Sequence, residues 1–405
     1  MSAMTSAHVL PDTTAPSPPG SWSAVWALTL CVSTLIASEF MPVSLLTPIA
    51  TDLLVSEGMA GQAIAISGLF AVLTSLSIST LIRRVDRRIV LLGLTVLMLA
   101  SGLIVAIAPN YLVFMVGRAL IGVVIGGFWS MSAATVMRLV PEEQVPRALA
   151  VLNGGNALAT TIAAPLGSFL GQFIGWRGAF MMVVPLAAIT LAWQWLALPA
   201  MAPRRSGAGT SALGVLRLRH ARGGMLAVAL LFAGQFALFT YLRPFLEGTT
   251  GLSVSLLSLV LLAMGAAGLL GTALIGRAVA RSLRATLTAA PLVMAAVALA
   301  LVALGTSAGP TAMLLGMWGL VGTALPVAWW TWLSRALPDD AEAGGGLMVA
   351  VIQLAITVGA AGGGLLFDAA GHQATFIASA ALLTASALIA GLDTRRTPDA
   401  ASPNR

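Results

Sequence analysis

Charged side chains are scarce in this sequence, and lysine is absent altogether. Only 9% of the 405 residues are charged, while 58% are hydrophobic and the mean hydropathy is +0.96. A water-soluble domain carries roughly 25% charged residues because its surface faces water. The shortage therefore excludes an ordinary soluble protein and predicts a chain whose surface lies mostly in lipid.

Cysteine and histidine are too few to build the usual chemical centres. The single cysteine, Cys31, excludes an intramolecular disulfide. Of the three histidines, His8 lies in a polar tail, and His220 and His372 lie in links between apolar runs. The sequence also has no nucleotide-binding loop and no nucleophile motif. We therefore expect no cofactor, no metal and no enzyme activity, and an energy source other than ATP.

Every basic residue is an arginine, 21 in all, and the net charge is +7. Nucleic-acid binding would need these arginines gathered on a soluble face. They lie instead in short links between apolar runs, as in cytoplasmic loops of membrane proteins. We therefore expect the lipid bilayer as partner and no nucleic acid.

The apolar runs are continuous and about 20 residues long, enough for a helix to cross the bilayer. A β-barrel would instead show short alternating segments. The sequence predicts an all-α membrane protein with twelve transmembrane helices. Their expected limits are 24–49, 61–82, 89–108, 112–136, 148–171, 178–199, 223–246, 254–275, 285–305, 311–334, 346–367 and 374–392.

The links suggest the domain organisation and the orientation. Residues 1–21 are rich in Pro, Ser and Thr and indicate a disordered tail, not a signal peptide. A basic linker at 201–222 separates helical bundles at 22–200 and 223–393, and a tail follows at 394–405. Eighteen arginines lie in alternate links and the C-terminal tail, against one, Arg177, in the opposite links. This asymmetry predicts that both termini are cytoplasmic.

The two predicted bundles are related in sequence. A shift of 197 residues takes the Arg-x-x-Pro-acid-acid segment at 138–143 to 335–340 and Asn156 to Gln353, and a shift of 196 takes Glu39 to Gln235. Such a repeat, with six spans in each half, is the pattern of transporters that bind substrate between two pseudo-symmetric halves near the bilayer midplane.

Glu39 is the first candidate functional residue. It lies about 15 residues into the first span, so ~22 Å of helix rise places it inside the hydrocarbon. A carboxylate there costs several kcal/mol unless it is protonated, paired or hydrated. That cost suits a group that carries protons, although a structural carboxyl between helices is the alternative.

Arg118 is the second candidate, in the fourth span and at a similar depth. Contact between Arg118 and Glu39 would make a switch that breaks on protonation. A permanent ion pair, or an arginine that reaches the outer interface, is the alternative.

Polar and aromatic residues in other spans make up a candidate substrate site. The polar ones recur at three- or four-residue spacing, so they share helix faces. The polar residues either line a cavity or hydrogen-bond neighbouring helices together. The aromatic residues either stack on a planar substrate or pack against other side chains. The set is Trp129, Asn153, Asn156, Thr160, Gln235, Phe239, Tyr241, Trp329, Gln353 and Thr357.

Several segments together resemble a known family. RRVDRR at 83–88, GRALIGVVIGG in the fourth span, and APLGSFLG with GWR around the fifth resemble drug:proton antiporters of the major facilitator superfamily. EFMPVSLLTPIATDL, GGFWSMSA and FTYLRP resemble, more narrowly, its purine ribonucleoside efflux permeases. The similarity runs from about Trp22 to Gly371.

The resemblance implies a major facilitator fold in a bacterial inner membrane and a role for the motif residues in conformational change. These are Arg84, Asp86, Arg87, Arg88, Pro165, Gly167 and Gly171. The link between the second and third spans departs from the family motif, since Ser79 and Arg83 replace its glycine and aspartate.

The resemblance further implies monomeric, proton-coupled export of purine ribonucleosides such as inosine and guanosine. Export of sugars or drugs by the same mechanism is the alternative within transporters. A non-transporting membrane sensor is the alternative from another class.

Overall fold

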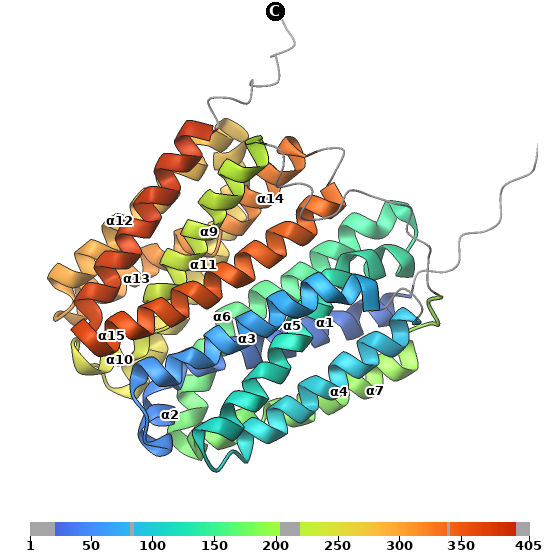
Figure 1. The fold of residues 1–405 in the computed structure, drawn as a ribbon, viewed down its shortest axis with the longest axis horizontal. Helices are drawn as coiled ribbons and strands as arrows, with labels where there is room; N and C mark the ends of the chain where they lie inside the picture. Colours follow the sequence, from blue (N-terminus) through green and yellow to red (C-terminus); the bar gives the residue numbers. More distant parts are fainter. Residues whose placement is uncertain (1–20, 82–84, 203–218, 338–340, 394–405) are drawn as a thin grey trace, which may run out of the picture.

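The computed structural model describes residues 21–81, 85–202, 219–337 and 341–393, and every regular element within these ranges is a helix (Figure 1). The helices are α1 (Trp22–Ser44), α2 (Leu46–Leu53), α3 (Glu57–Leu81), α4 (Arg87–Ala106), α5 (Tyr111–Leu139), η2 (Glu142–Gln144), α6 (Val145–Met181), α7 (Val183–Ala197), α9 (Arg219–Phe239), α10 (Leu242–Gly248), α11 (Val254–Arg281), α12 (Leu283–Leu304), α13 (Ala308–Gly322), α14 (Leu325–Ala336) and α15 (Ala341–Asp393). The predicted tails, most of the predicted linker and motif residue Arg84 lie outside the described ranges.

The described residues contain ten helical segments that are long and apolar enough to cross a membrane. Two of them are about twice the usual length, and each contains one glycine with non-helical backbone angles: Gly175 (φ 70°) and Gly371 (φ 73°). Positive φ at these points is open to glycine but strained for other residues. The two breaks fall between the predicted spans 148–171 and 178–199, and between 346–367 and 374–392. With each of the two long segments counted as two spans, the ten segments correspond to the twelve predicted spans, with differences at their ends.

Four predicted spans are each divided into two helices. The breaks lie at Leu45 between α1 and α2, at Met182 between α6 and α7, at 240–241 between α9 and α10, and at 323–324 between α13 and α14. A proline follows each break by two to four residues, namely Pro48, Pro185, Pro244 and Pro326. Proline lacks the N–H that would continue the helix, which explains the interruptions.

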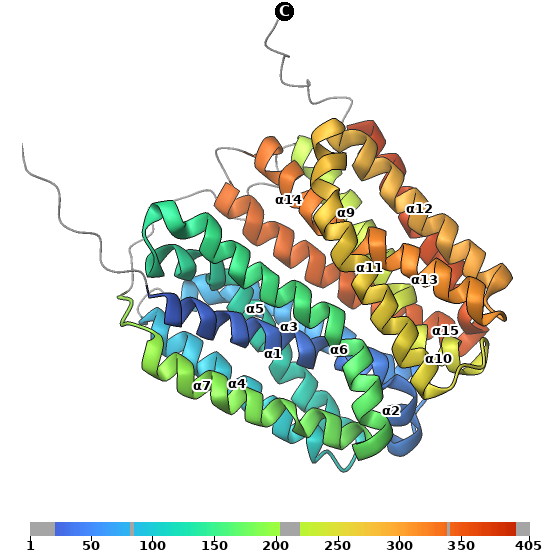
Figure 2. The same ribbon diagram turned by 180° about the vertical axis from the view of Figure 1, so that it is seen from behind.

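The helices pack as two halves, which we call the N-terminal half (21–202) and the C-terminal half (219–393). In the first, α1 packs on α6, and α5 packs on α3 and α4; in the second, α9 and α12 pack on α15, and α11 on α13. The halves lie side by side, and they meet where α3 contacts α15 and α6 contacts α11 (Figures 1 and 2).

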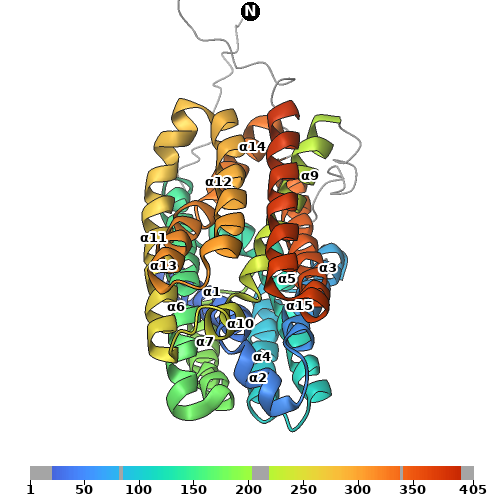
Figure 3. The same cartoon turned by 90° about the vertical axis from the view of Figure 1, so that its left-hand side faces the viewer.

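The short helices α2 and α10 lie next to each other at one end of the molecule (Figure 3). We call this end, where several hydrogen bonds join the halves, the joined end.

Candidate functional site

The site is built around a proline in α1. Pro42 has no N–H to donate to the carbonyl of Ser38, four residues earlier in the helix. Both Ser38 and the adjacent Glu39 are buried, so the unpaired carbonyl needs another donor. That donor comes from α5.

Arg118 supplies the missing hydrogen bond. Its Nη1 donates to the Ser38 carbonyl at 2.7 Å and its Nη2 to the Glu39 carbonyl at 3.0 Å. The same guanidinium donates to the Ala63 carbonyl at 3.2 Å and to the Ser67 hydroxyl at 3.3 Å, both on α3. Arg118 is fully buried, and these acceptors compensate for the loss of water around its charge. The arginine thus ties α1, α3 and α5 together.

The two candidate residues are brought together, but not as a salt bridge. Two ion pairs occur between described residues, Arg177 with Asp52 and Arg243 with Glu247, and neither involves Glu39. The guanidinium of Arg118 bonds to the main chain of Glu39, and its charge acts on the nearby carboxyl through space. The carboxyl is therefore free to bond elsewhere.

The Glu39 carboxyl interacts with the Gln353 side chain, which belongs to the C-terminal half. Next to it, Phe40 stacks on Phe236 with ring centroids 5.8 Å apart and meets the edge of Phe239 at 6.4 Å. The candidate proton carrier therefore lies at the junction of the two halves. A change in its charge acts directly on the contact between them.

Five polar atoms of the C-terminal half are buried without a hydrogen-bond partner among the described residues. They are Oε1 of Gln235, Oε1 of Gln353, Nε1 of Trp329 and Oγ1 of Thr240 and Thr288. Unpaired buried polar groups cost about 1–3 kcal/mol each, and in native proteins they have water or a ligand as partner. Of the predicted residues, Gln235 and Gln353 thus offer two acceptors and Trp329 one donor to a polar molecule.

The contacts described for the predicted residues on α5 and α6 lie within the N-terminal half. Asn153 is exposed and donates to the carbonyl of Leu149 in its own helix, and Thr160 does the same to Asn156. Trp129 is half-buried and meets the edge of the Phe128 ring. No described contact joins these side chains to Glu39.

Thr357 and Tyr241 lie where the halves touch. Thr357 packs so closely on α3 that a Cβ on Gly68 would lie 2.3 Å from its hydroxyl oxygen. Tyr241 is fully buried near the joined end, and its hydroxyl donates to the Ala360 carbonyl at 2.8 Å. A Cβ on Gly61 would overlap the Tyr241 hydroxyl, so this contact depends on glycine.

Side chains that were not predicted hold the joined end together. Asp368 of the C-terminal half accepts hydrogen bonds from the Ser56 hydroxyl at 2.5 Å and the Gly58 amide at 2.8 Å. Its carboxylate therefore caps the start of α3 in the other half, where the helix dipole favours negative charge. Arg243, paired with Glu247 at 2.7 Å, donates to the carbonyl of Ser44.

The motif residues before α4 hold α4 against the end of α7. Asp86 accepts from the amides of Arg88 and Met201, at 2.8 Å and 2.9 Å. Arg88 donates to the Trp195 carbonyl at 2.7 Å and lies over the ring of that tryptophan. Arg87 donates through its amide to the Met201 carbonyl. These contacts lie within the N-terminal half.

The motif residues of α6 face the end of α1. A Cβ on Gly167 would lie 2.6 Å from the Ser44 hydroxyl, and one on Gly171 would lie 2.4 Å from Leu45. Pro165 is buried in the same stretch of α6. These residues let α6 approach α1 at the break between α1 and α2.

One sequence signal for the site was available and was missed. A proline four residues after Ser38 leaves that carbonyl unpaired, which would have indicated a donor from another helix. Ser56 also accepts a hydrogen bond from the Met59 amide at 3.0 Å, which is a local cap of α3. By contrast, no local pattern distinguishes Asp368, because its partners Ser56 and Gly58 lie more than 300 residues away.

Comparisons with known proteins give the family. The model of the Major Facilitator Superfamily matches residues 27–347. The transcription regulatory protein OpdE of Pseudomonas aeruginosa is 58% identical, over 94% of this chain and 96% of that protein. The purine ribonucleoside efflux pump NepI of Salmonella paratyphi B is 42% identical, over 93% of this chain and 95% of that protein.

A solved structure has the same fold. The bacterial homologue of the human lysosomal transporter Spinster, in an inward-facing and unoccupied conformation, superposes with a TM-score of 0.77 at 15% identity, covering 94% of this chain and 98% of that one. The paired halves, the buried acid at their junction and these matches agree. The chain is a multi-pass membrane protein that belongs to the major facilitator superfamily.

Proposed function

We propose that this protein exports a small neutral solute, a purine ribonucleoside such as inosine or guanosine, in exchange for protons. The observation that carries the proposal is the place of Glu39, a buried carboxyl that contacts Gln353 across the junction of the halves. The efflux pump NepI, 42% identical, supports the substrate class.

The proposed mechanism is alternating access with Glu39 as proton carrier. In the outward-facing state Glu39 takes up a proton and the substrate leaves; in the inward-facing state it releases the proton and substrate binds. With both termini in the cytoplasm, as the arginine distribution predicts, the joined end faces outward and this structure is inward-facing. Exchange of one proton for a neutral solute moves charge, worth ~2.3 kcal/mol per 100 mV.

The C-terminal half supplies the proposed substrate contacts. The unpaired oxygens of Gln235 and Gln353 suit the donors of a nucleoside, and the indole N–H of Trp329 suits an acceptor. Next to Glu39, the aromatic rings of Phe40, Phe236 and Phe239 offer faces on which a purine could stack. Asn153, Asn156, Thr160 and Trp129 contribute to the entry path in this proposal.

Export of a sugar or of drugs by the same mechanism is the alternative substrate assignment. A cationic drug would gain from several buried acids, whereas Glu39 is the one carboxyl among the buried charged side chains of the described residues. This favours a neutral substrate.

A sensory role is the alternative from another class, and the name of the relative from Pseudomonas aeruginosa, a transcription regulatory protein, favours it. We propose that any effect on transcription follows from transport, because exporting a metabolite lowers the concentration that a soluble regulator senses. A variant that folds but does not transport would then lose the transcriptional effect as well.

Counterflow in proteoliposomes tests the proposal. Vesicles loaded with unlabelled inosine should take up labelled inosine, and guanosine should compete while arabinose and ethidium should not. Uptake of another solute with none of inosine would remove the nucleoside assignment. Absence of any transport, with a transcriptional effect retained, would favour the sensor.

A further inference from the structure

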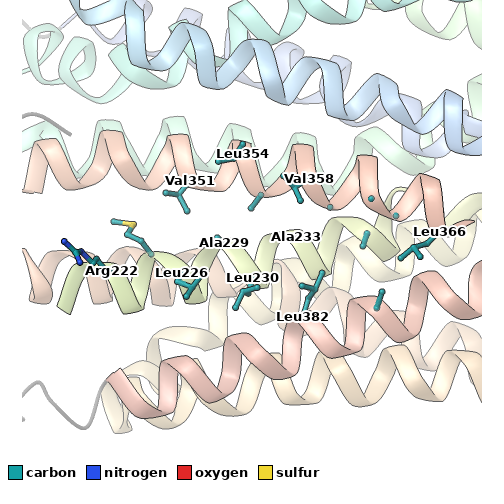
Figure 4. A pocket seen from close by; sticks show the side chains of 17 residues that line it. Arg222, Leu226, Ala229, Leu230, Ala233, Val351, Leu354, Val358, Leu366 and Leu382 are labelled. Atoms are coloured by element: carbon teal, nitrogen blue, oxygen red, sulfur yellow. The ribbon is translucent and has the colours of Figure 1, made fainter. Parts of the chain in front are cut away.

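A groove runs along the outside of the C-terminal half, between the two limbs of α15 and over α9 (Figure 4). Its volume is about 540 Å³. The floor comes from small residues of α9, including Ala229 and Ala233, and the walls come from Leu354, Val358 and Leu382 of α15. The lining is almost entirely apolar.

The groove faces the surroundings of the protein. Leu226, Leu354 and Val358 are 50%, 49% and 57% exposed. They lie in membrane-spanning segments, so lipid chains cover them. From Arg222 to Ala237 the groove follows α9 for ~22 Å, more than half of a ~30 Å hydrocarbon core. This length suits one acyl chain of a lipid from a single leaflet.

One end of the groove carries a charge. Arg222 lines the groove near the start of α9 and is exposed, and it is the charged residue of the lining. At the first turn of a spanning helix, a guanidinium lies at the depth of lipid headgroups. Basic residues beside grooves between helices bind anionic headgroups at this depth.

We propose that this groove binds an anionic phospholipid, with an acyl chain along α9 and the phosphate on Arg222. The lipid fills the space between the limbs of α15 and so supports the helix that carries Gln353 and Thr357. This site is separate from the proposed substrate site, and its test does not depend on transport.

The glycines of α15 provide matched variants. A Cβ on Gly362, which lines the groove, would meet no atom within 4 Å, so Gly362→Leu should add a side chain to the groove without a clash at Cβ. Gly346 lies in equally open space on the same helix and does not line the groove. Gly346→Leu is therefore the control for the apolar part, and Arg277→Ala, which removes an exposed arginine of α11, is the control for the charge.

The full-length protein would be released from vesicles of equal phosphatidylglycerol and phosphatidylcholine, and bound lipids counted by native mass spectrometry. We expect wild type to retain phosphatidylglycerol preferentially. Arg222→Ala should reduce this preference about fivefold, the effect of one basic residue at a membrane surface. Gly362→Leu should reduce retention of both lipids.

Two outcomes would overturn the proposal. One is equal phosphatidylglycerol retention by Arg222→Ala and Arg277→Ala. The other is equal total lipid retention by Gly362→Leu and Gly346→Leu. Because the two pairs of variants test the headgroup and the chain separately, misfolding of one variant leaves the other test intact.

Discussion

Arg118 contributes mainly through its hydrogen bonds. It replaces the helical donor that Pro42 removes and joins three helices around the main chain of Glu39. The sequence predicts Glu39 and Arg118 as candidates because ionisable residues inside a span are costly. It does not predict which atoms they contact, since that depends on how α1, α3 and α5 cross.

Replacement of Arg118 by lysine should therefore be damaging although the charge is kept. Lysine is a point charge and cannot reproduce the guanidinium fork that spans acceptors on two helices. One buried carbonyl left without a donor costs about 1–3 kcal/mol. We expect a lower midpoint of thermal unfolding in detergent and slower inosine counterflow. Arg277→Lys, at an exposed position, is the control, and equal midpoints for the two variants would contradict the role given to Arg118.

Helix ends and breaks in this protein follow from proline and glycine. The links between predicted spans at 172–177 and 368–373 each contain one glycine, and the breaks lie at these glycines, Gly175 and Gly371. The breaks within spans were not predicted because hydropathy does not report backbone hydrogen bonds: apart from Ser44, the residues from Phe40 to Leu46 are apolar across the break at Leu45. The capping of α3 by Asp368 could not be predicted either, because the two helices that it joins are adjacent only in the folded chain.

Removal of that cap should loosen the joined end. Asp368→Ala leaves the start of α3 without its cross-half acceptor, and an exposed, charge-assisted contact contributes about 1 kcal/mol. We expect the ratio of joined to separated conformations to fall about fivefold. Spin labels at Thr51 and Gln373, in a Cys31→Ser background, would report this as a longer distance population.

The control for this measurement is Asp52→Ala. Asp52 pairs with Arg177 at the same end, but both residues belong to the N-terminal half. Its loss should leave the distance distribution between the labels unchanged. A distribution that responds to Asp52→Ala as strongly as to Asp368→Ala would remove the special role of the cross-half cap.

At the scale of the whole molecule, the sequence predicts the two halves through their repeat, and the fold confirms the paired architecture. A shift of 196 residues takes one glycine break to the other, from Gly175 to Gly371. The repeat does not predict how the halves touch, because the contact of Glu39 with Gln353 is not symmetric. The counterpart of Glu39 in the other half is Gln235, and the counterpart of Gln353 is Asn156.

The orientation of the molecule is a separate prediction. The arginine distribution places the C-terminus in the cytoplasm. Green fluorescent protein fused after Arg405 should therefore fluoresce, and alkaline phosphatase fused there should be inactive. Fusions at Thr249, in the link after α10, should behave in the opposite way. An active phosphatase at the C-terminus would reverse the assignment of this structure as inward-facing.

The central claim is that Glu39 couples proton movement to solute export, and uphill transport tests it most directly. In proteoliposomes that are acidic inside by one pH unit, with the membrane potential held at zero, wild type should concentrate inosine about tenfold for one proton exchanged. Glu39→Gln should lose this accumulation and keep inosine counterflow, because glutamine preserves the shape and hydrogen bonding of the site but carries no proton. Glu143→Gln, an exposed carboxyl at η2, should behave as wild type. Accumulation of inosine by Glu39→Gln to the wild-type level would contradict the account.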